Sequence, residues 1–351
     1  STMPDPRFKD YDADDIRGFF LMRLKEDVRD EAGDNLSERQ LVPLDNTTSA
    51  ASDDEEAAYA VLAELREAIA AGRKSEETKH LWKNNALVQY GLYKLFLSSP
   101  EACQHSLQGR IVRETETNPD NPELPYLQRL LKCLKVLNIR KSSRYQLLVR
   151  QLKDMGWDGS KNSPRILVFT EYRHTQDALA AALAKDFKLK HSDKFEDQAT
   201  QTLAVIHGSV PDIHLTKTVE AFGTGTATVR MLLATDVASE GINLHHECHN
   251  IIHYDLPWSI ITLIQRNGRI DRFGQNIPPV LRYLIVNTEQ GLLEGDREIF
   301  ARLITKVEEI NRSTRSGESV LKLYDPEAEE RYIAEQGLLA GNTNVLEQAA
   351  S

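Results

Sequence analysis

The stretch Ile166-Leu167-Val168-Phe169-Thr170 is a run of four apolar residues that ends on a polar one. Its length and its apolar character are typical of a strand that is buried on both faces. Similar runs follow along the chain at 203–206, 229–234, 250–254 and 280–286. Helical patterns separate the early runs, at 175–184 and 212–222. This alternation predicts an α/β fold, with a parallel sheet covered by helices on both faces.

Polar residues stand where the predicted strands end, and ligands of such sheets bind beyond the carboxyl ends of the strands. These candidate functional residues are Thr170-Glu171, His207-Gly208, Thr235-Asp236 and Asp255. Small residues in 235–244 would let the backbone approach a ligand closely. The Thr235 hydroxyl can donate to a phosphate, and Asn243 can bond a sugar hydroxyl. The alternative is a strand-to-helix loop that is only well capped.

The stretch Gln265-Arg266-Asn267-Gly268-Arg269-Ile270-Asp271-Arg272-Phe273-Gly274-Gln275 carries arginines at i, i+3 and i+6. These positions lie roughly on one helical face. We expect the three guanidiniums to converge there without paired acids, as an anion site that suits phosphate. The alternative is a solvated basic helix face. The apolar run 260–264 disfavours it, because it anchors the segment in a core.

A different periodicity fills the part of the chain before residue 155. Apolar residues recur there at every third or fourth position, as in Tyr59, Leu62 and Leu65. The pattern predicts an α-helical bundle or insertion over 46–155, whose apolar stripes form a core. The acidic run Asp53-Asp54-Glu55-Glu56 begins the first of these helices. We expect it to cap the helix rather than to catalyse a reaction.

Composition and charge limit the class of protein. The chain has 351 residues, which is room for about two domains. No apolar run approaches the ~20 residues of a membrane helix, so no membrane partner is expected. Three scattered cysteines argue against a disulfide framework and a metal site, and suit a cytoplasmic protein. The net charge of −10 means that nucleic acid could bind only at a local patch or with help from another region.

Several of these segments resemble motifs of the superfamily-two helicases and translocases. The stretches 235–244 and 265–275 resemble motifs V and VI, and 166–175 resembles motif IV. More narrowly, the chain is similar to the Swi/Snf-type branch and to its bacterial RapA-like members. This narrower likeness rests on Phe273-Gly274-Gln275 at the end of motif VI, on Asp255-Leu256-Pro257-Trp258, and on 21–28, which resembles a segment between two ATPase lobes. Ser259 departs from the branch, which usually has Asn there.

The resemblance implies a RecA-like lobe and assigns roles to its residues. Arg269 and Arg272 would be arginine fingers that reach the γ-phosphate of ATP held on another lobe. Gln265 would orient their helix or contact the nucleotide. The residues implied to lie near the nucleotide are Asp236, Gly241, Asn243 and Gly268. Those implied to contact the nucleic-acid backbone are Thr170, His207 and Thr235.

The phosphate-cradling loop G-x-x-x-x-G-K-[S/T] of ATP sites is absent from the sequence. Gly72-Arg73-Lys74-Ser75 is the nearest string, but it lacks the upstream glycine and follows a helix. We therefore expect half of a composite site, with ATP and Mg²⁺ bound mainly by a first lobe that this sequence lacks, and no activity of this chain alone. The expected divisions are 1–45, joining the first lobe, 46–155, helical, 156–290, the RecA-like lobe, and 291–351, C-terminal helices and tail.

The function expected from the sequence is that of the second lobe of an ATP-dependent DNA helicase or translocase, with duplex DNA as its partner. An RNA helicase lobe is the alternative within the same superfamily. A third possibility is a non-catalytic docking module, in which 55–155 binds RNA polymerase or another protein. The acidic net charge supports that third possibility.

Overall fold

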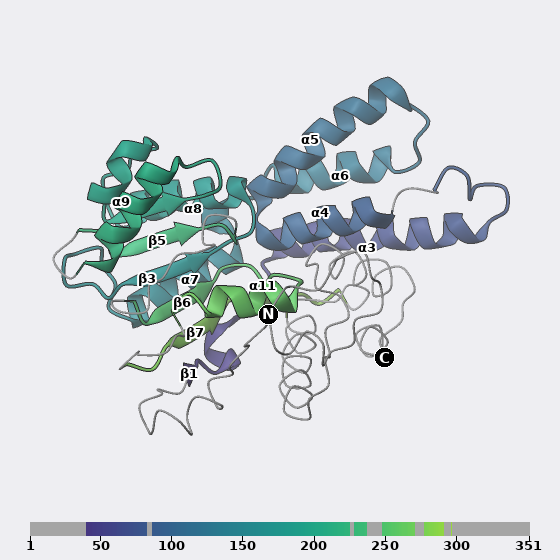
Figure 1. Ribbon diagram of the computed structural model, residues 1–351. Coiled ribbons are helices and arrows are strands. Elements are labelled where there is room, and N and C mark those ends of the chain that lie inside the picture. The colour runs from purple at the N-terminus through teal and green to yellow at the C-terminus, as the bar shows by residue number, and fades with distance from the viewer. Residues whose placement is uncertain are drawn as a thin grey trace, which may run out of the picture.

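The computed structural model describes residues 40–82, 86–224, 228–236, 248–270, 277–290 and 296. A parallel sheet flanked by helices forms one part of the molecule, and a set of long helices projects from it (Figure 1). The predictions that concern 1–39 lie outside the described residues. So do those that concern Gly241, Asn243 and Arg272.

In the described part of the chain, six parallel strands form the main sheet, in the order β1-β7-β6-β3-β5-β4. Their bounds are Gln40–Leu41 (β1), Ile166–Phe169 (β3), Leu203–Ile206 (β4), Met231–Ala234 (β5), Asn250–His253 (β6) and Val280–Tyr283 (β7). Phe169 is in register with Ala234 on one side and with His253 on the other. The carboxyl ends of the three central strands therefore meet at one edge.

The predicted single strand over 280–286 is wrong, because the chain forms two strands there. β7 ends at Tyr283, and β8 (Ile285–Asn287) pairs instead with β2 (Thr48–Ala50) in a separate parallel pair. Leu284 lies between them, and its amide donates to the carbonyl of His253 at 3.1 Å. The sequence does not reveal that the two strands have different partners, because the residues immediately before and after Leu284 are apolar or aromatic and buried.

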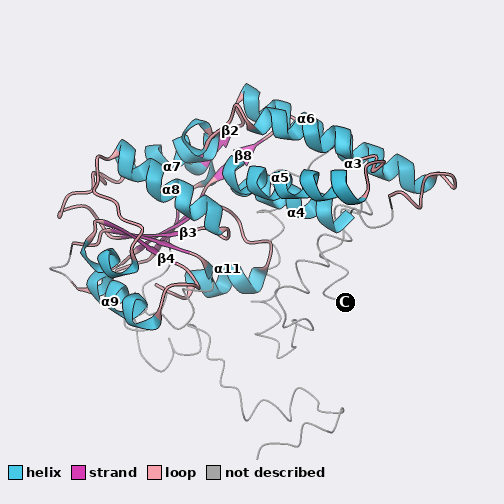
Figure 2. Cartoon of the chain, turned by 90° about the horizontal axis from the view of Figure 1, so that it is seen from above, coloured by secondary structure: helices cyan, strands magenta, loops and turns pink. Residues whose placement is uncertain are grey.

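Side chains alternate between the two faces of the sheet. Ile166 and Val168 share a core with α7 (Ser143–Asp154) and α8 (Arg173–Asp186). Leu167 and Phe169 join the core that contains α9 (Asp212–Gly223) and α11 (Ile260–Asn267). Figure 2 shows the two helix pairs on opposite sides of the strands. The predicted α/β fold class is confirmed: a parallel sheet has helices on both faces and is preceded by an α-helical region.

Four helices form what we call the helical arm. They are α3 (Asp53–Lys74), α4 (Ala86–Ser98), α5 (Pro100–Thr117) and α6 (Leu124–Leu134). The described residues also form short 3₁₀ helices at Leu44–Thr47, Ile139–Lys141 and Phe195–Thr200. A capping box of Ser52 and Glu55 starts α3, which confirms the predicted capping role of the acidic run. No described helix is both long and apolar enough to cross a membrane.

The helical arm packs against the sheet layer. Residues of α3 and α4 share one continuous apolar core with the strands, and α5 contacts α8. Tyr93 of α4 meets Trp258 edge-to-face, with ring centroids 6.2 Å apart. Trp258 lies just before α11. The arm therefore touches the chain where it enters the arginine-rich stretch.

Candidate functional site

A buried carboxylate, that of Asp255, organises the carboxyl edge of the sheet. Its side chain accepts the hydroxyls of Thr170 and Ser98, each at 2.6 Å, and the amide of Glu171 at 3.0 Å. Asp255 is 4% exposed and Thr170 is fully buried. The structure thus places the Thr170 hydroxyl, expected at the nucleic-acid backbone, on Asp255 and away from solvent.

Arg266 corrects the prediction of three arginines without paired acids. It is 1% exposed, and its Nε and Nη2 donate to the two oxygens of Asp236 at 2.6 and 2.8 Å. Its Nη1 donates to the carbonyl of Asp255 at 3.0 Å, and its guanidinium lies 5.4 Å from the Phe169 ring centroid. A guanidinium buried among apolar groups needs such a counter-charge. The prediction of a shared anion site is therefore wrong for Arg266.

Both side-chain oxygens of Asp236, a residue expected near the nucleotide, accept hydrogen bonds from Arg266. Burial acts to lower the pKa of Arg266, but the Asp236 and Asp255 carboxylates more than offset it and hold the pKa above its ordinary value. Arg266 is therefore always charged. The fork geometry of its contact with Asp236 fixes the start of the loop after β5 against α11.

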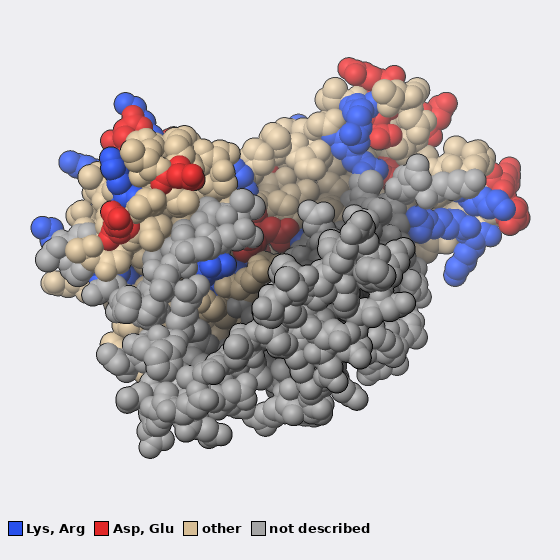
Figure 3. Space-filling model, viewed as in Figure 1, with Lys and Arg blue, Asp and Glu red and all other residues tan. Residues whose placement is uncertain are grey.

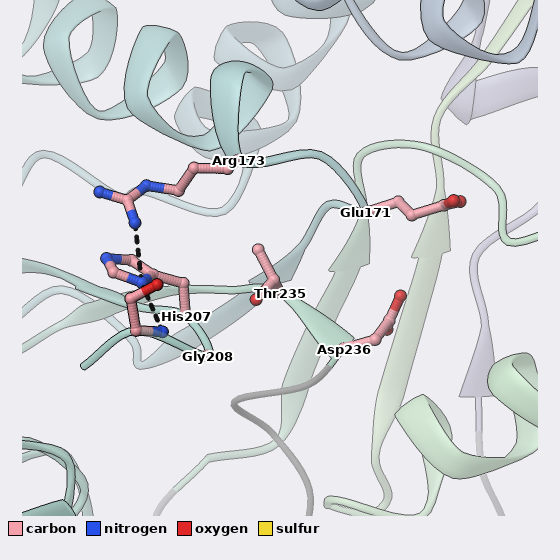
Figure 4. A pocket seen from close by; sticks show the side chains of 7 residues that line it. Glu171, Arg173, His207, Gly208, Thr235 and Asp236 are labelled. Carbon is pink, nitrogen blue, oxygen red and sulfur yellow. Dashed lines mark hydrogen bonds between the residues drawn. The ribbon is translucent and has the colours of Figure 1, made fainter. Parts of the chain in front are cut away.

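A pocket of about 270 Å³ opens beside this pair, at the ends of β3, β4 and β5 (Figure 4). It brings together His207 and Thr235, both expected at the nucleic-acid backbone. The residues that line it are Glu171, Arg173, His207, Gly208, Ser209, Thr235 and Asp236. Figure 4 shows Arg173 and His207 close together at one side, with Glu171 and Asp236 at the other.

His207 is held in one protonation state and one tautomer. Its Nδ1 lies 2.8 Å from Nη1 of Arg173 and accepts the amide of Ser209 at 3.2 Å. Both partners are donors, so Nδ1 is the acceptor and the ring proton is on Nε2. Burial, and then the charge of Arg173, lower the pKa of His207. The ring is therefore a neutral donor near pH 7.

The remaining predicted residues lie at the end of α11. Gln265 is exposed, whereas Gly268 and Arg269 are half-buried in the turn that follows the helix. Asn267 holds this end in place, since its side chain bonds the His253 ring at 2.9 Å and the Tyr283 hydroxyl at 3.1 Å. The structure thus sets Arg269 next to a fixed stretch of backbone. Gly241, Asn243 and Arg272 lie outside the described residues.

Two residues of α4 belong to this edge and were not predicted. Lys94 forms an ion pair with Glu171 at 2.7 Å, and Ser98 bonds Asp255. They are four positions apart and so lie on one face of α4. No sequence signal marks them, because Ser98 and its partner are 157 positions apart.

The described residues on the face shown in Figure 3 form no broad basic surface. Basic and acidic side chains are interspersed among the described residues that Figure 3 displays. This agrees with the net charge of −10. In this part of the chain, the groups around the pocket are local ones that could bind a phosphate.

Residues 144–274 match the family model described as the helicase conserved C-terminal domain. The chain is 51% identical over 47 residues to an uncharacterized ATP-dependent helicase, YqhH, of Bacillus subtilis, which covers 13% of this chain and 8% of that protein. It is 29% identical over 117 residues to the mitochondrial DEAD-box ATP-dependent RNA helicase 9 of Arabidopsis thaliana, covering 33% of this chain and 16% of that protein. The chain thus spans less than a fifth of either relative's length.

The C-terminal part of the Fun30 ATPase domain resembles the chain in structure. The TM-score is 0.48 at 12% identity, with 78% of this chain and 99% of that one covered. The family match begins within α7 and takes in the strand ends, the pocket and the arginine-rich stretch. Residues 144–274 are therefore similar in sequence to the C-terminal domains of helicases.

Proposed function

We propose that this chain carries the second lobe of an ATP-dependent translocase of the Swi/Snf type, acting on duplex DNA. In this proposal Arg269 and Arg272 are arginine fingers for ATP that another lobe binds. The observation that carries it is the clamp of Arg266 on Asp236. The clamp ties the loop after β5 to α11, and so holds Arg269 at the same edge of the sheet as the pocket.

The neighbours of Arg269 support this role because they are fixed while it is half-exposed. Arg266 and Asn267 are both buried and hydrogen-bonded, and the amide of Arg269 donates to the carbonyl of Arg266 at 3.2 Å. A donor that is placed before the reaction stabilises developing phosphoryl charge without reorganisation at that moment. This is what an arginine finger requires.

The residues present suit part of an ATP site only. Gln265 and Arg269 can donate to phosphate oxygens, but the sequence has no P-loop. Among the described residues, no three His, Cys, Asp or Glu side chains gather as ligands for a metal ion. ATP with Mg²⁺ would supply the phosphoryl group whose transfer drives movement of the lobes. We propose that another lobe binds both, and that Asp236, Gly241, Asn243 and Gly268 lie near the nucleotide.

The pocket is the proposed contact with the nucleic-acid backbone. The Nε2–H of His207 and the hydroxyl of Thr235 are donors suited to phosphate, and Arg173 adds a positive charge. Such contacts position the strand and do not read its sequence. Thr170 would act indirectly, through Asp255.

We propose duplex DNA rather than RNA as the substrate because Trp258 and Gly274-Gln275 resemble the Swi/Snf-type pattern. The Arabidopsis relative, however, is named as an RNA helicase. Stimulation of ATP hydrolysis by duplex DNA, single-stranded DNA and RNA decides between them, in the protein that contains both lobes. Stimulation by RNA alone would move the assignment to an RNA helicase.

The arginine fingers are tested in the same two-lobe protein. We expect Arg269→Ala and Arg272→Ala each to lower kcat for ATP hydrolysis by about 10³-fold or more. Arg113→Ala is the matched control, because Arg113 is an exposed arginine of α5. This chain alone should release no phosphate from ATP above background. Full activity of both finger variants would instead favour a docking module for a protein such as RNA polymerase.

A further inference from the structure

A chain of three buried hydroxyls links the helical arm to the centre of the site. Ser99 lies 2.7 Å from Thr175, Thr175 lies 2.8 Å from Ser98, and Ser98 donates to Asp255 at 2.6 Å. At the far end, the amide of Ala102 donates to Ser99 at 3.1 Å, which caps α5. All four side chains are at most 4% exposed. We call Ser99, Thr175 and Ser98 the hydroxyl relay.

The relay can be oriented in only one way. A carboxylate accepts hydrogen bonds but does not donate them, and each hydroxyl has a single hydrogen. Ser98 gives its hydrogen to Asp255, so it must accept from Thr175. Thr175 must then accept from Ser99. Every donor is thus used, and the bonds reinforce one another along the row.

Asp255 passes this constraint on to the arginine-rich stretch. Its carbonyl accepts Nη1 of Arg266, and its carboxylate also accepts the Thr170 hydroxyl and the Glu171 amide. A break at Ser98 would take a donor from the carboxylate, and a break at Thr175 would remove the bond that orients the Ser98 hydroxyl toward it. In either case the carboxylate could turn. The carbonyl that holds Arg266 belongs to the same residue, so it would shift with it.

Two further contacts of α4 act on the same segments. Lys94 pairs with Glu171, and Tyr93 packs on Trp258 just before α11. One helix of the arm therefore touches the end of β3, the end of β6 and the approach to α11. A helix that only filled the core would have no reason to meet all three with polar or aromatic contacts.

We propose that Ser98, Ser99 and Thr175 are positioning residues that let the helical arm set the placement of α11. The effect on catalysis rests on the proposed function, because it acts through Arg269. The effect on the placement of α11 is independent of the proposed function. The arm is then a working part of the site, and a change in how α4 and α5 sit would reach the arginines directly.

The test compares Thr175→Val with Thr175→Ser in the full chain. Valine keeps the shape of threonine but cannot bond, whereas serine keeps the hydroxyl. The measurement is hydrogen–deuterium exchange, followed in peptides from 260–270 and, as a control, in peptides from α6. We expect Thr175→Val to speed exchange in 260–270 by about tenfold and to leave α6 unchanged. Thr175→Ser should match the unaltered chain.

Ser98→Ala provides a second, independent break in case Thr175→Val fails to fold. It removes one donor from Asp255 and should speed exchange over 260–270 in the same way. Ser106→Ala, an exposed serine of α5, is its matched control. If either broken variant folds with a lowered Tm but unchanged exchange in 260–270, the relay only stabilises the arm and the proposal is overturned.

Activity in the two-lobe protein separates this proposal from the proposed function. We expect Thr175→Val to lower kcat by about tenfold, with little change in KM for ATP, and Thr175→Ser to restore it. Loss of activity in Arg269→Ala but not in Thr175→Val would sink the relay alone. Full activity in Arg269→Ala would sink the arginine-finger role, while the exchange result would still decide on the relay.

Discussion

Two buried arginines hold adjacent carbonyls at the end of β6 from opposite faces of the sheet. Arg144 of α7 donates to the carbonyl of Tyr254 at 3.0 Å, and Arg266 of α11 donates to that of Asp255 at the same distance. Each arginine also has an aspartate partner, Asp296 for Arg144 and Asp236 for Arg266. The two arrangements use the same chemistry.

They differ in the exposure of the acid. The side chain of Asp296 is 2% exposed, whereas that of Asp236 is 28% exposed and lines the pocket. The pair of Arg144 is thus sealed in the core, and the pair of Arg266 is open to whatever enters the pocket. We infer that the first pair only stabilises the fold, while the second connects the pocket to the arginine-rich stretch.

The largest effect on stability is expected from Arg144→Met. The change leaves Asp296 as an unpaired buried charge and takes a donor from two carbonyls, those of Tyr254 and Leu284. We expect the free energy of unfolding to fall by about 3–5 kcal/mol. Urea unfolding measures it. Arg150→Met is the control, since Arg150 is an exposed residue of the same helix. A loss for Arg144→Met as small as that of the control would break the comparison.

We expect Arg266→Met to lower the free energy of unfolding less than Arg144→Met does, but to lower kcat more. Asp236 can be hydrated once its partner is gone, so we expect a loss of about 1–3 kcal/mol in the free energy of unfolding. The displaced α11 should lower kcat of the two-lobe protein by about 10²-fold. Equal stability losses for Arg144→Met and Arg266→Met, with kcat unaffected by either, would show that the two pairs do the same thing.

The contrast also shows how far the sequence alone leads. Continuous apolar runs such as 166–170 predicted the strands, because a strand buried on two faces must be apolar throughout. The alternation of these runs with helical patterns predicted both helix layers. The prediction of a parallel sheet also located the candidate site, because the carboxyl ends of parallel strands lie at one edge of the sheet. His207 and Thr235 were both expected at this edge, and in the structure both line one pocket.

The same reasoning failed where the partner is distant in sequence. Spacing of i, i+3 and i+6 places three arginines on one helical face, but it cannot show that Asp236, 30 positions away, neutralises the first. Nor does any local pattern join Ser98 and Thr175, which are 77 positions apart. Long-range polar contacts depend on how the helical arm docks, and helical periodicity does not specify docking.

Acid should disturb the Arg266 side before the Arg144 side, through His253. This ring is buried between Phe169 and Tyr283, on the face that holds Arg266. Burial, and then the charge of Arg266, lower its pKa to about 3. The folded pKa lies below the ordinary value, so between the two values the unfolded chain binds the extra proton. Stability that is present near pH 7 is therefore lost as the pH falls below about 6.5.

The expected slope is a loss of about 1.4 kcal/mol in the free energy of unfolding per pH unit below that point. Urea unfolding at several pH values from 7.0 to 5.0 measures it. His253→Gln keeps a donor for Asn267 but cannot be protonated, so its slope should be shallower by about one proton. Identical slopes for the variant and the unaltered chain would mean that His253 is charged in the fold, and that the Arg266 side is not the acid-sensitive one.

A third arginine–carboxylate pair should matter least, although it is bidentate like the pair of Arg266. Arg129 of α6 bonds both oxygens of Glu64 of α3, with Nη2 3.1 Å from Oε1, but both side chains are about half exposed. Water and salt compete for exposed charges, and ordering two long side chains offsets much of the attraction. We expect Arg129→Met to leave the urea midpoint unchanged within error at physiological ionic strength. A loss like that of Arg266→Met would show that the fork geometry these two pairs share stabilises them whatever their exposure. No change would leave burial of the acid as the property that separates the three.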